Sequence, residues 1–599
     1  MPHASLAVVP RTGDEGVELV CGVFGKLFGT EQLKQELTPL LAGEAGPLSP
    51  ARLLALGYRA MGRDWLAAVE GEFATFMYDA ARGYLITRTD NIGIGRLHYA
   101  HDADRYGVCT DLGTLLSLFR PDEIRPQALR EYFFLGYLPA PHTAYQHVYK
   151  SLPGHSQILR AHAWQLTDTG RQAAPPFLAS ASPLADASSS DAEDIVLAAL
   201  ERSIERRLDG ATSATVLLTS GYDSTLCAAI LKSKCDRVRS FTIGFEERKV
   251  NENEDARKIA QHLGLEHHEL MFSADRLLDE LVEWVQAHAE PWCHPNGLPT
   301  YVAHGELRRQ GDDRMVFDGS GGDYLFRDFG EFATMVAQLG TVPTALLPRL
   351  ICALPVSMKR LIFRARDEIP SWRIQQAVKR ADWAHRSAAD RLIFHNPWKS
   401  DDYRQLIGSD FKLGDTQPGR EFFAGGSEPM DRYLAYYRSW GFDASVGRAV
   451  MESRLQGMRA TFPYEDSDLV GLVERMPSRP TVGEGGTRFV QESLTRRFIP
   501  GQYFASRKKA METPIELILA SRRGRELVGH YYAAARKRKD NLYDMAVADA
   551  ARDRFYAGSA GDALKVWSVV CFEVWREGMV RGLMPLSAPT APPCSHPDP

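Results

Sequence analysis

Several signatures that identify common protein classes are missing from this 599-residue chain. It contains no GxxxxGK(S/T) stretch and no GxGxxG stretch, which excludes a Walker phosphate loop and the usual dinucleotide fingerprint. Its eight cysteines show neither CxxC nor Cys/His spacing, so no zinc site or disulfide framework is indicated. Such cysteine usage is typical of the reducing cytoplasm, where we expect the protein to be located.

The sequence also offers little for a nucleic acid or a membrane to bind. The net charge of −5 provides no basic field for a polyanion. The first 20 residues carry acidic side chains and no apolar core, which argues against a secretory signal. The most apolar later stretch, 341–362, is interrupted by prolines and basic residues, so we expect no membrane span.

The length predicts at least two domains, because one hydrophobic core rarely serves more than about 300 residues. Short strand patterns dominate the first part and predict a β-rich α+β sandwich over 20–165, after a loose lead-in over 1–19. The stretch 166–191 is rich in proline, alanine and serine, and we predict that it is a linker.

Beyond this stretch, strand and helix patterns alternate along the chain. Apolar strands are expected at 215–218, 238–243, 268–272 and 314–317, with helices between them. The alternation predicts an α/β fold with a doubly wound parallel sheet, in a domain that spans 192–582 and ends in a largely helical part. The proline-rich end, 583–599, is predicted to be disordered.

A turn of small residues after the strand at 215–218 is the best candidate for a binding site. It reads Thr219-Ser220-Gly221-Tyr222-Asp223-Ser224. Hydroxyl groups and the free N–H groups of the first helical turn meet there, and the helix dipole favours an anion such as phosphate. An ordinary strand-to-helix turn is the alternative that these residues leave open.

A second glycine-rich turn follows the strand at 314–317 and reads Asp318-Gly319-Ser320-Gly321-Gly322-Asp323-Tyr324-Leu325-Phe326. Ligands of open α/β sheets bind at the carboxyl edge of the strands, so both turns can face one nucleotide. Asp223 and Asp323 are then candidate ligands of a metal ion on that nucleotide. In the alternative interpretation Asp223 only caps its helix and Asp323 only closes its turn.

Together with several flanking segments, these turns resemble the asparagine synthetase superfamily from about 20 to 582. The turns are similar to its SGGxDS and SxxGGDELF motifs. Further similar segments follow in the family's order: 240–245 (SFSIGF), 263–268 (LGxxHH), Glu290-Pro291 (DEP), 462–466 (VPFLD) and 506–514 (RxKxGFxxP).

The resemblance implies an enzyme that adenylates a carboxylate with ATP and Mg²⁺, releases pyrophosphate and lets an amine displace AMP. Asp223 and Asp323 would hold Mg²⁺, and Lys508 would stabilise developing negative charge. For Lys508 and Lys509 the alternative is an exposed pair without a catalytic role. ATP is expected to contact Leu218, Thr219, Ser220, Gly221, Tyr222, Asp223, Ser224, Thr242, Ile243, Gly244, Phe245, Gly319, Ser320, Gly321 and Gly322.

The first domain resembles class II glutamine amidotransferases, whose nucleophile is an N-terminal cysteine with a free amine as its base. Cys21 lies in a similar context, CGVFG, but 20 residues precede it. The stretch 26–64 also lacks the family's RGPD, HRRLSIID and NGEIYN segments, which hold glutamine. We therefore expect a degenerate domain in which Cys21, a doubtful nucleophile, is a buried strand residue. Translation from Val20 is the alternative, although it would not restore the pocket.

Two departures bear on the substrate. Arg459 stands where the family commonly has a glutamate near the amine site, and Tyr324 replaces the glutamate after GGD. In these respects the chain resembles lasso peptide cyclases more than β-lactam synthetases. This implies a precursor peptide whose own amine captures an adenylated Asp or Glu, with a leader-peptide protease and a recognition protein as partners. A glutamine- or ammonia-dependent amide synthetase, a small-molecule lactam synthetase and a non-enzymatic nucleotide- or peptide-binding scaffold are the alternatives.

Overall fold

The computed structural model of the chain describes most of its residues. They are 4–10, 17–40, 48–67, 69–102, 105–121, 123–160, 165–171, 189–247, 251–311, 315–326, 396–410, 442–474, 489–504, 512–538 and 542–581, with a few single positions between 350 and 420. The expected disordered tail at 583–599 lies outside the described residues.

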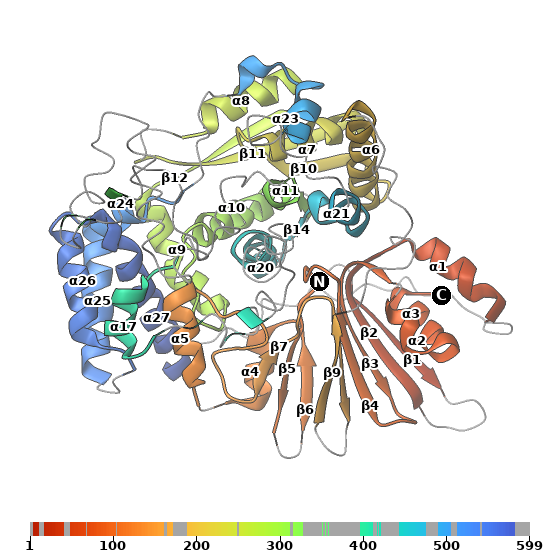
Figure 1. Cartoon of the computed structure of the whole chain (residues 1–599), viewed down its shortest axis with the longest axis horizontal. Helices are drawn as coiled ribbons and strands as arrows, with labels where there is room; N and C mark the ends of the chain where they lie inside the picture. The colour runs from red at the N-terminus through yellow and green to blue at the C-terminus, as the bar shows by residue number, and fades with distance from the viewer. Residues whose placement is uncertain are drawn as a thin grey trace.

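The N-terminal region is built on an antiparallel six-stranded sheet (Figure 1). Leu19, Cys21 and Val23 alternate along one strand and are buried, as expected for a sheet with one packed face. Three helices cover this face, α1 (Thr30–Leu37), α2 (Pro50–Met61) and α3 (Arg63–Ala67). In spatial order the strands are β1 (Ala4–Pro10), β2 (Val17–Phe28), β3 (Glu70–Asp79), β4 (Tyr84–Thr89), β8 (His155–Arg160) and β9 (Gln165–Arg171).

Two expected boundaries are corrected by this sheet. The supposed lead-in contains β1, which pairs with β2 so that Ala7 lies opposite Cys21. The supposed linker begins with β9, which pairs with β8. Both are strands at the edges of the sheet, and β9 has the mostly polar sequence QLTDTGR. The polar side chains of β9 therefore carry little of the pattern that predicts a strand.

A smaller sheet with the order β6-β5-β7 completes the N-terminal region. Its strands are β5 (His98–His101), β6 (Tyr106–Cys109) and β7 (Val148–Lys150). Next to it in the chain are α4 (Leu112–Phe119) and α5 (Pro126–Leu135), whose apolar side chains join the largest core of the molecule.

The second half contains a five-stranded sheet in which every pairing is parallel. This arrangement confirms the predicted α/β fold. The strands in spatial order are β12 (Glu266–Phe272), β11 (Arg237–Phe245), β10 (Ser213–Leu217), β13 (Met315–Phe317) and β14 (Arg459–Thr461). The helices between them include α6 (Ser189–Leu208), α7 (Tyr222–Lys234), α8 (Asn253–Leu263), α9 (Ala274–Ala287) and α10 (Gly297–Arg309).

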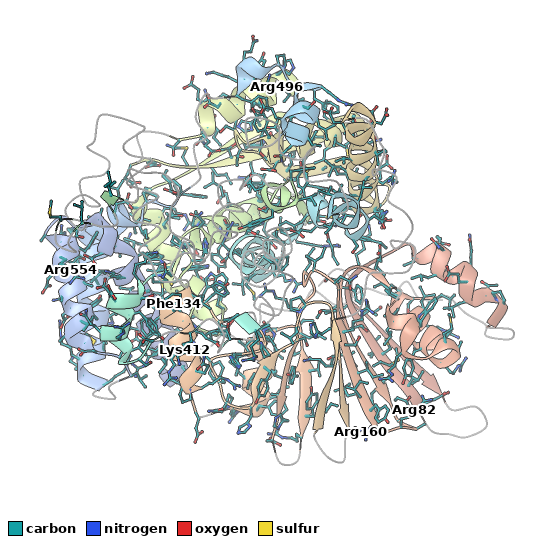
Figure 2. The ribbon with its side chains drawn as sticks, viewed as in Figure 1. Arg82, Phe134, Arg160, Lys412, Arg496 and Arg554 are labelled. Carbon is teal, nitrogen blue, oxygen red and sulfur yellow. The ribbon has the colours of Figure 1, made fainter. Side chains whose placement is uncertain are left out.

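The C-terminal helices pack against both halves of the chain. Tyr132 of α5 donates a hydrogen bond to Ser568 O at 2.7 Å. Phe134, labelled in Figure 2, meets the ring of Tyr403 edge-on at 5.4 Å. The two halves therefore share one core. These helices are α17 (Ser400–Ile407), α24 (Ile515–Ala520), α25 (Arg522–Arg538), α26 (Met545–Tyr556) and α27 (Ala563–Arg581).

Within the described part of the chain, no helix combines the length and the apolar character needed to cross a membrane.

Candidate functional site

The turn at 219–224 joins β10 to α7 and is closed by its own hydroxyl groups. Ser224 Oγ accepts a hydrogen bond from Thr219 N at 3.0 Å and lies 2.9 Å from Thr219 Oγ1. Gly221 is the N-cap residue of α7 and has no side chain to cap the helix. The start of α7 therefore presents N–H groups beside these hydroxyl groups, which is the arrangement that binds phosphate.

Glu252 holds Ser220 of this turn, and it was not predicted from the sequence. Its Oε2 atom accepts hydrogen bonds from Ser220 N at 3.1 Å and from Ser220 Oγ at 3.3 Å. Glu252 is buried and directly precedes α8. The first turn is therefore held in place by a buried carboxylate from outside the two predicted segments.

The second turn, 318–323, packs directly against the first. A Cβ atom added to Gly319 would lie 2.7 Å from Ser224 N. A Cβ atom added to Gly322 would lie 2.1 Å from Asp223 Oδ1. Side chains are excluded at both positions because the two turns are in contact. The structure thus brings the two predicted turns together, while the ligand that they bind stays a prediction.

A third segment, the 3₁₀ turn η7 (Pro463–Glu465), completes the group. Tyr464 is fully buried and donates a hydrogen bond from its Oη to Asp223 O at 2.9 Å. Glu465 packs against Gly321, where an added Cβ would lie 2.5 Å from the Glu465 Oε1 atom. Gly321 also has a left-handed backbone with φ of 97°, which favours glycine. This segment therefore touches both glycine-rich turns.

Gln491 is a further contact of the site that sequence reasoning missed. It lies on α23 (Phe489–Arg496), is fully buried, and donates a hydrogen bond from Nε2 to Asp223 Oδ1. Because this bond orients the Asp223 carboxylate, Gln491 belongs to the site. No local pattern around 491 marks it, since 268 positions separate the two residues.

Both aspartates lie close to the phenol of Tyr464. Burial raises the pKa of Tyr464 well above its usual range, and the charges of Asp223 and Asp323 raise it further. Among the described residues, no group of three or more His, Cys, Asp or Glu side chains could hold a metal ion by itself. Proteins usually bind Mg²⁺ through one or two carboxylates and complete its shell with water and substrate phosphates. Asp223 and Asp323 are two carboxylates of this kind, and their role as Mg²⁺ ligands stays a prediction.

Most of the other predicted nucleotide contacts lie at the carboxyl ends of β10 and β11. Thr242 donates a hydrogen bond from Oγ1 to Leu218 O at 2.6 Å, which ties the two strand ends together. Ile243, Gly244 and Phe245 follow on β11 and are buried. Lys508 and Lys509 lie outside the described residues, so their roles stay predictions.

Cys21 lies in the middle of β2 and is fully buried. Its Sγ atom is 3.8 Å from Thr75 Oγ1, and burial raises the pKa of the thiol to about 12 despite this contact. A nucleophilic cysteine needs a lowered pKa or an adjacent base. In this structure the thiol is a core side chain, as we expected from the sequence.

Arg459, which replaces the family's glutamate, is the first residue of β14. Its Nη2 atom donates to Glu72 Oε2 at 2.7 Å, and Glu72 belongs to β3 of the N-terminal sheet. Arg459 is therefore paired with a carboxylate, and its effect on the amine site stays a prediction. The carboxylate at this position comes from the other half of the chain.

The parallel sheet and the three segments at its carboxyl edge define a nucleotide-dependent α/β enzyme. Residues 196–577 match the asparagine synthase family, and residues 12–169 match the glutamine amidotransferase domain family. The chain belongs to the asparagine synthase family. It is a carbon–nitrogen ligase of the asparagine synthetase type, a class that forms amides with ATP.

Relatives with similar sequences cover most of the chain. A Mycobacterium bovis protein provisionally named a glutamine-hydrolyzing asparagine synthetase is 22% identical over 564 residues, which are 92% of this chain and 83% of that protein. A glutamine-hydrolyzing asparagine synthetase of Bacillus subtilis is 20% identical over 539 residues, covering 88% of this chain and 80% of that protein. Among solved structures, a glutamine-dependent NAD⁺ synthetase from Acinetobacter baumannii covers 67% of this chain and 88% of its own, at 12% identity and a TM-score of 0.19.

Proposed function

We propose that this ligase is a lasso peptide cyclase that forms a macrolactam within a precursor peptide. The reaction would join an Asp or Glu side chain of the peptide to the peptide's own N-terminal amine. A carboxylate oxygen attacks the α-phosphorus of ATP, and pyrophosphate leaves. The amine then attacks the acyl carbon, AMP leaves with the electrons of the broken acyl–oxygen bond, and the amine loses a proton.

The observation that carries this proposal is the position of Cys21. A ligase that draws ammonia from glutamine needs an activated thiol, whereas the Cys21 thiol is buried in a core and its pKa is raised to about 12. An amine already present in the substrate removes the need for that chemistry. Tyr324 after Gly321-Gly322-Asp323 also supports this choice, since lasso cyclases carry a non-glutamate there.

An amine on the same molecule also has a kinetic advantage. Holding two groups of one molecule in reacting geometry replaces a second diffusing reactant, and this is worth up to about 7–11 kcal/mol of the barrier. A shaped site that excludes water protects the adenylate while the amine approaches. We expect Mg²⁺ to be held by Asp223 and Asp323, which would offset charge on the leaving pyrophosphate.

A glutamine- or ammonia-dependent amide synthetase is the second candidate, favoured by the names of the relatives described above. A test separates the two. The full chain is incubated with Mg·ATP and a precursor peptide encoded beside its gene, with the leader protease if one is present. The cyclase should yield a peptide that has lost one water, with stoichiometric AMP.

Parallel reactions with free aspartate plus glutamine, and with aspartate plus ammonium, complete the experiment. Asp223→Asn serves as the inactive control for each reaction. An amide formed only from glutamine or ammonium would overturn the cyclase proposal and establish the second candidate. Cyclisation of a small amino acid derivative in place of the peptide would instead identify a small-molecule lactam synthetase.

A further inference from the structure

We infer that Glu72, in the N-terminal domain, is a positioning residue for the ligase site in the other half of the chain. It holds the turn η7 against the two glycine-rich turns. The N-terminal domain then contributes to amide formation without any glutamine chemistry, and its effect on rate rests on the proposed ATP-dependent activity.

The Glu72 carboxylate accepts three hydrogen bonds, and all come from the ligase domain. Oε1 accepts from Arg207 Nε at 2.9 Å and from Thr461 Oγ1 at 2.8 Å, and Oε2 accepts from Arg459 Nη2 at 2.7 Å. Glu72 is 1% exposed. Burial alone would raise its pKa, but the charges of Arg207 and Arg459 outweigh burial and hold the pKa below its usual range. The carboxylate is therefore ionised and fixed by its donors.

The contact with Thr461 reaches the site directly. Thr461 is the last residue of β14, and its carbonyl oxygen accepts a hydrogen bond from Asp318 N at 3.0 Å. Asp318 is the first residue of the second glycine-rich turn, and η7 follows Thr461 after one intervening residue. Glu72 therefore holds the point from which both segments start.

The contact with Arg207 fixes the two ends of η7. Arg207 Nη1 lies 3.2 Å from Asp466 Oδ2, just after the turn. The same Nη1 donates to Ser203 Oγ at 2.8 Å, and Ser203 Oγ donates to Pro463 O at 2.6 Å, at the start of the turn. Arg207 and Ser203 both lie on α6. Loss of the Glu72 carboxylate would remove the Nε contact that holds the Arg207 guanidinium, whose Nη1 atom meets both anchors.

Between these anchors lie the residues that touch the site. Tyr464 bonds to Asp223 O, and Glu465 packs against Gly321. A small shift of η7 therefore moves a predicted Mg²⁺ ligand relative to the second turn. Figure 1 shows β14 and α21 (Ser467–Glu474), which flank η7, on the side of the ligase domain that faces the N-terminal sheet.

Two variants of the full chain test this inference. Glu72→Gln removes the charge and keeps the shape of the side chain. Thr461→Val removes only the hydroxyl contact, and it decides the question if Glu72→Gln fails to fold. Lys26→Met is the control, because Lys26 also crosses the interface. Its Nζ atom donates to Arg206 O at 2.9 Å and Arg207 O at 3.4 Å and pairs with Asp209, and none of these contacts involves the Arg207 guanidinium or η7.

The first measurement is peptide-resolved hydrogen exchange without substrate. Faster exchange over 461–469 and 219–225 is expected in Glu72→Gln and Thr461→Val but not in Lys26→Met. The second is the peptide-dependent release of AMP, whose kcat should fall about 10-fold in both variants, since small misplacements of reacting groups cost rate steeply. The Mg²⁺ concentration for half-maximal rate should rise as well, a change that lower stability alone would not produce.

Unchanged exchange at both segments in folded Thr461→Val, or the same increase in Lys26→Met, would overturn the inference. Unchanged kcat in Thr461→Val would do so as well. If the wild-type chain releases no AMP with any substrate, the proposed function fails. The exchange measurement still decides whether Glu72 holds the turn.

Discussion

Tyr464 Oη lies 2.9 Å from the main-chain carbonyl oxygen of Asp223, and this hydrogen bond links η7 to the residue predicted to hold Mg²⁺. The ring of Tyr464 also meets Phe326, just after α11 (Gly322–Leu325), edge-on at 5.8 Å. One side chain therefore contacts the elements that follow both glycine-rich turns. Its position explains why a segment far along the sequence can affect the nucleotide site.

Replacing Tyr464 with phenylalanine should lower kcat several-fold. The ring remains, but the hydrogen bond that fixes the Asp223 backbone is lost, together with about 1 kcal/mol of stability. Tyr132→Phe is the matched control, since it removes a buried phenol bond to another carbonyl oxygen, Ser568 O at 2.7 Å, away from the site. The two variants should therefore have similar melting temperatures but different rates. Equal rates at equal stability would contradict the role of Tyr464.

Asp223→Asn and Asp323→Asn should each reduce the rate by about 10²-fold or more, because each removes a carboxylate that would stabilise transition-state charge through Mg²⁺. The measurement is the release of AMP and pyrophosphate at saturating substrate. Asp553→Asn, on the surface of α26, should leave the rate unchanged. Release of ADP and phosphate by the wild type would show that the assignment of these turns is wrong.

The two glycine-rich turns could be predicted because the relevant pattern is local. Each is a short run of small residues after an apolar strand, and the order of strands along the chain predicts a parallel sheet with both turns at one edge. The structure places the turns in contact, with Gly322 against Asp223. Their packing follows from glycines that the sequence already shows.

Glu72, Glu252 and Gln491 could not be predicted as parts of the site. Each reaches its partner through the tertiary fold, and the partners are distant in sequence, as Gln491 and Asp223 are by 268 positions. None lies in a run of residues with a chemical pattern of its own. The same limit applies to β9, an edge strand with the mostly polar sequence QLTDTGR that is held by its pairing with β8.

The wild-type chain should not hydrolyse glutamine, and Cys21→Ala should leave ATP-dependent amide formation unchanged. The reason is that the thiol is buried and its raised pKa keeps it protonated at neutral pH. Glutamate release from glutamine measures the first point. Thiol labelling should also leave Cys21 unmodified in the native protein and modify it after denaturation. Glutaminase activity that Cys21→Ala abolishes would refute the degenerate assignment and favour the amide synthetase.

The interface between the halves of the chain should lose stability as the pH rises toward neutrality, and Glu70 should be responsible. Burial, together with the charges of Asp468 and Asp466, raises the pKa of Glu70 from 4.5 to about 7. Arg206, 3.8 Å from its carboxylate, opposes this shift only in part.

Because the folded state binds this proton more tightly than the unfolded chain, stability from Glu70 is fully present below pH 4.5 and is lost as the pH rises through about 7. The loss amounts to at most about 3 kcal/mol. The free energy of unfolding, measured in urea from about pH 5 to pH 8, should therefore fall more steeply for the wild type than for Glu70→Gln, which cannot titrate. Glu31→Gln is the control, because that side chain is 79% exposed and should leave the slope unchanged. Parallel curves for the wild type and Glu70→Gln would show that Glu70 does not titrate in this range.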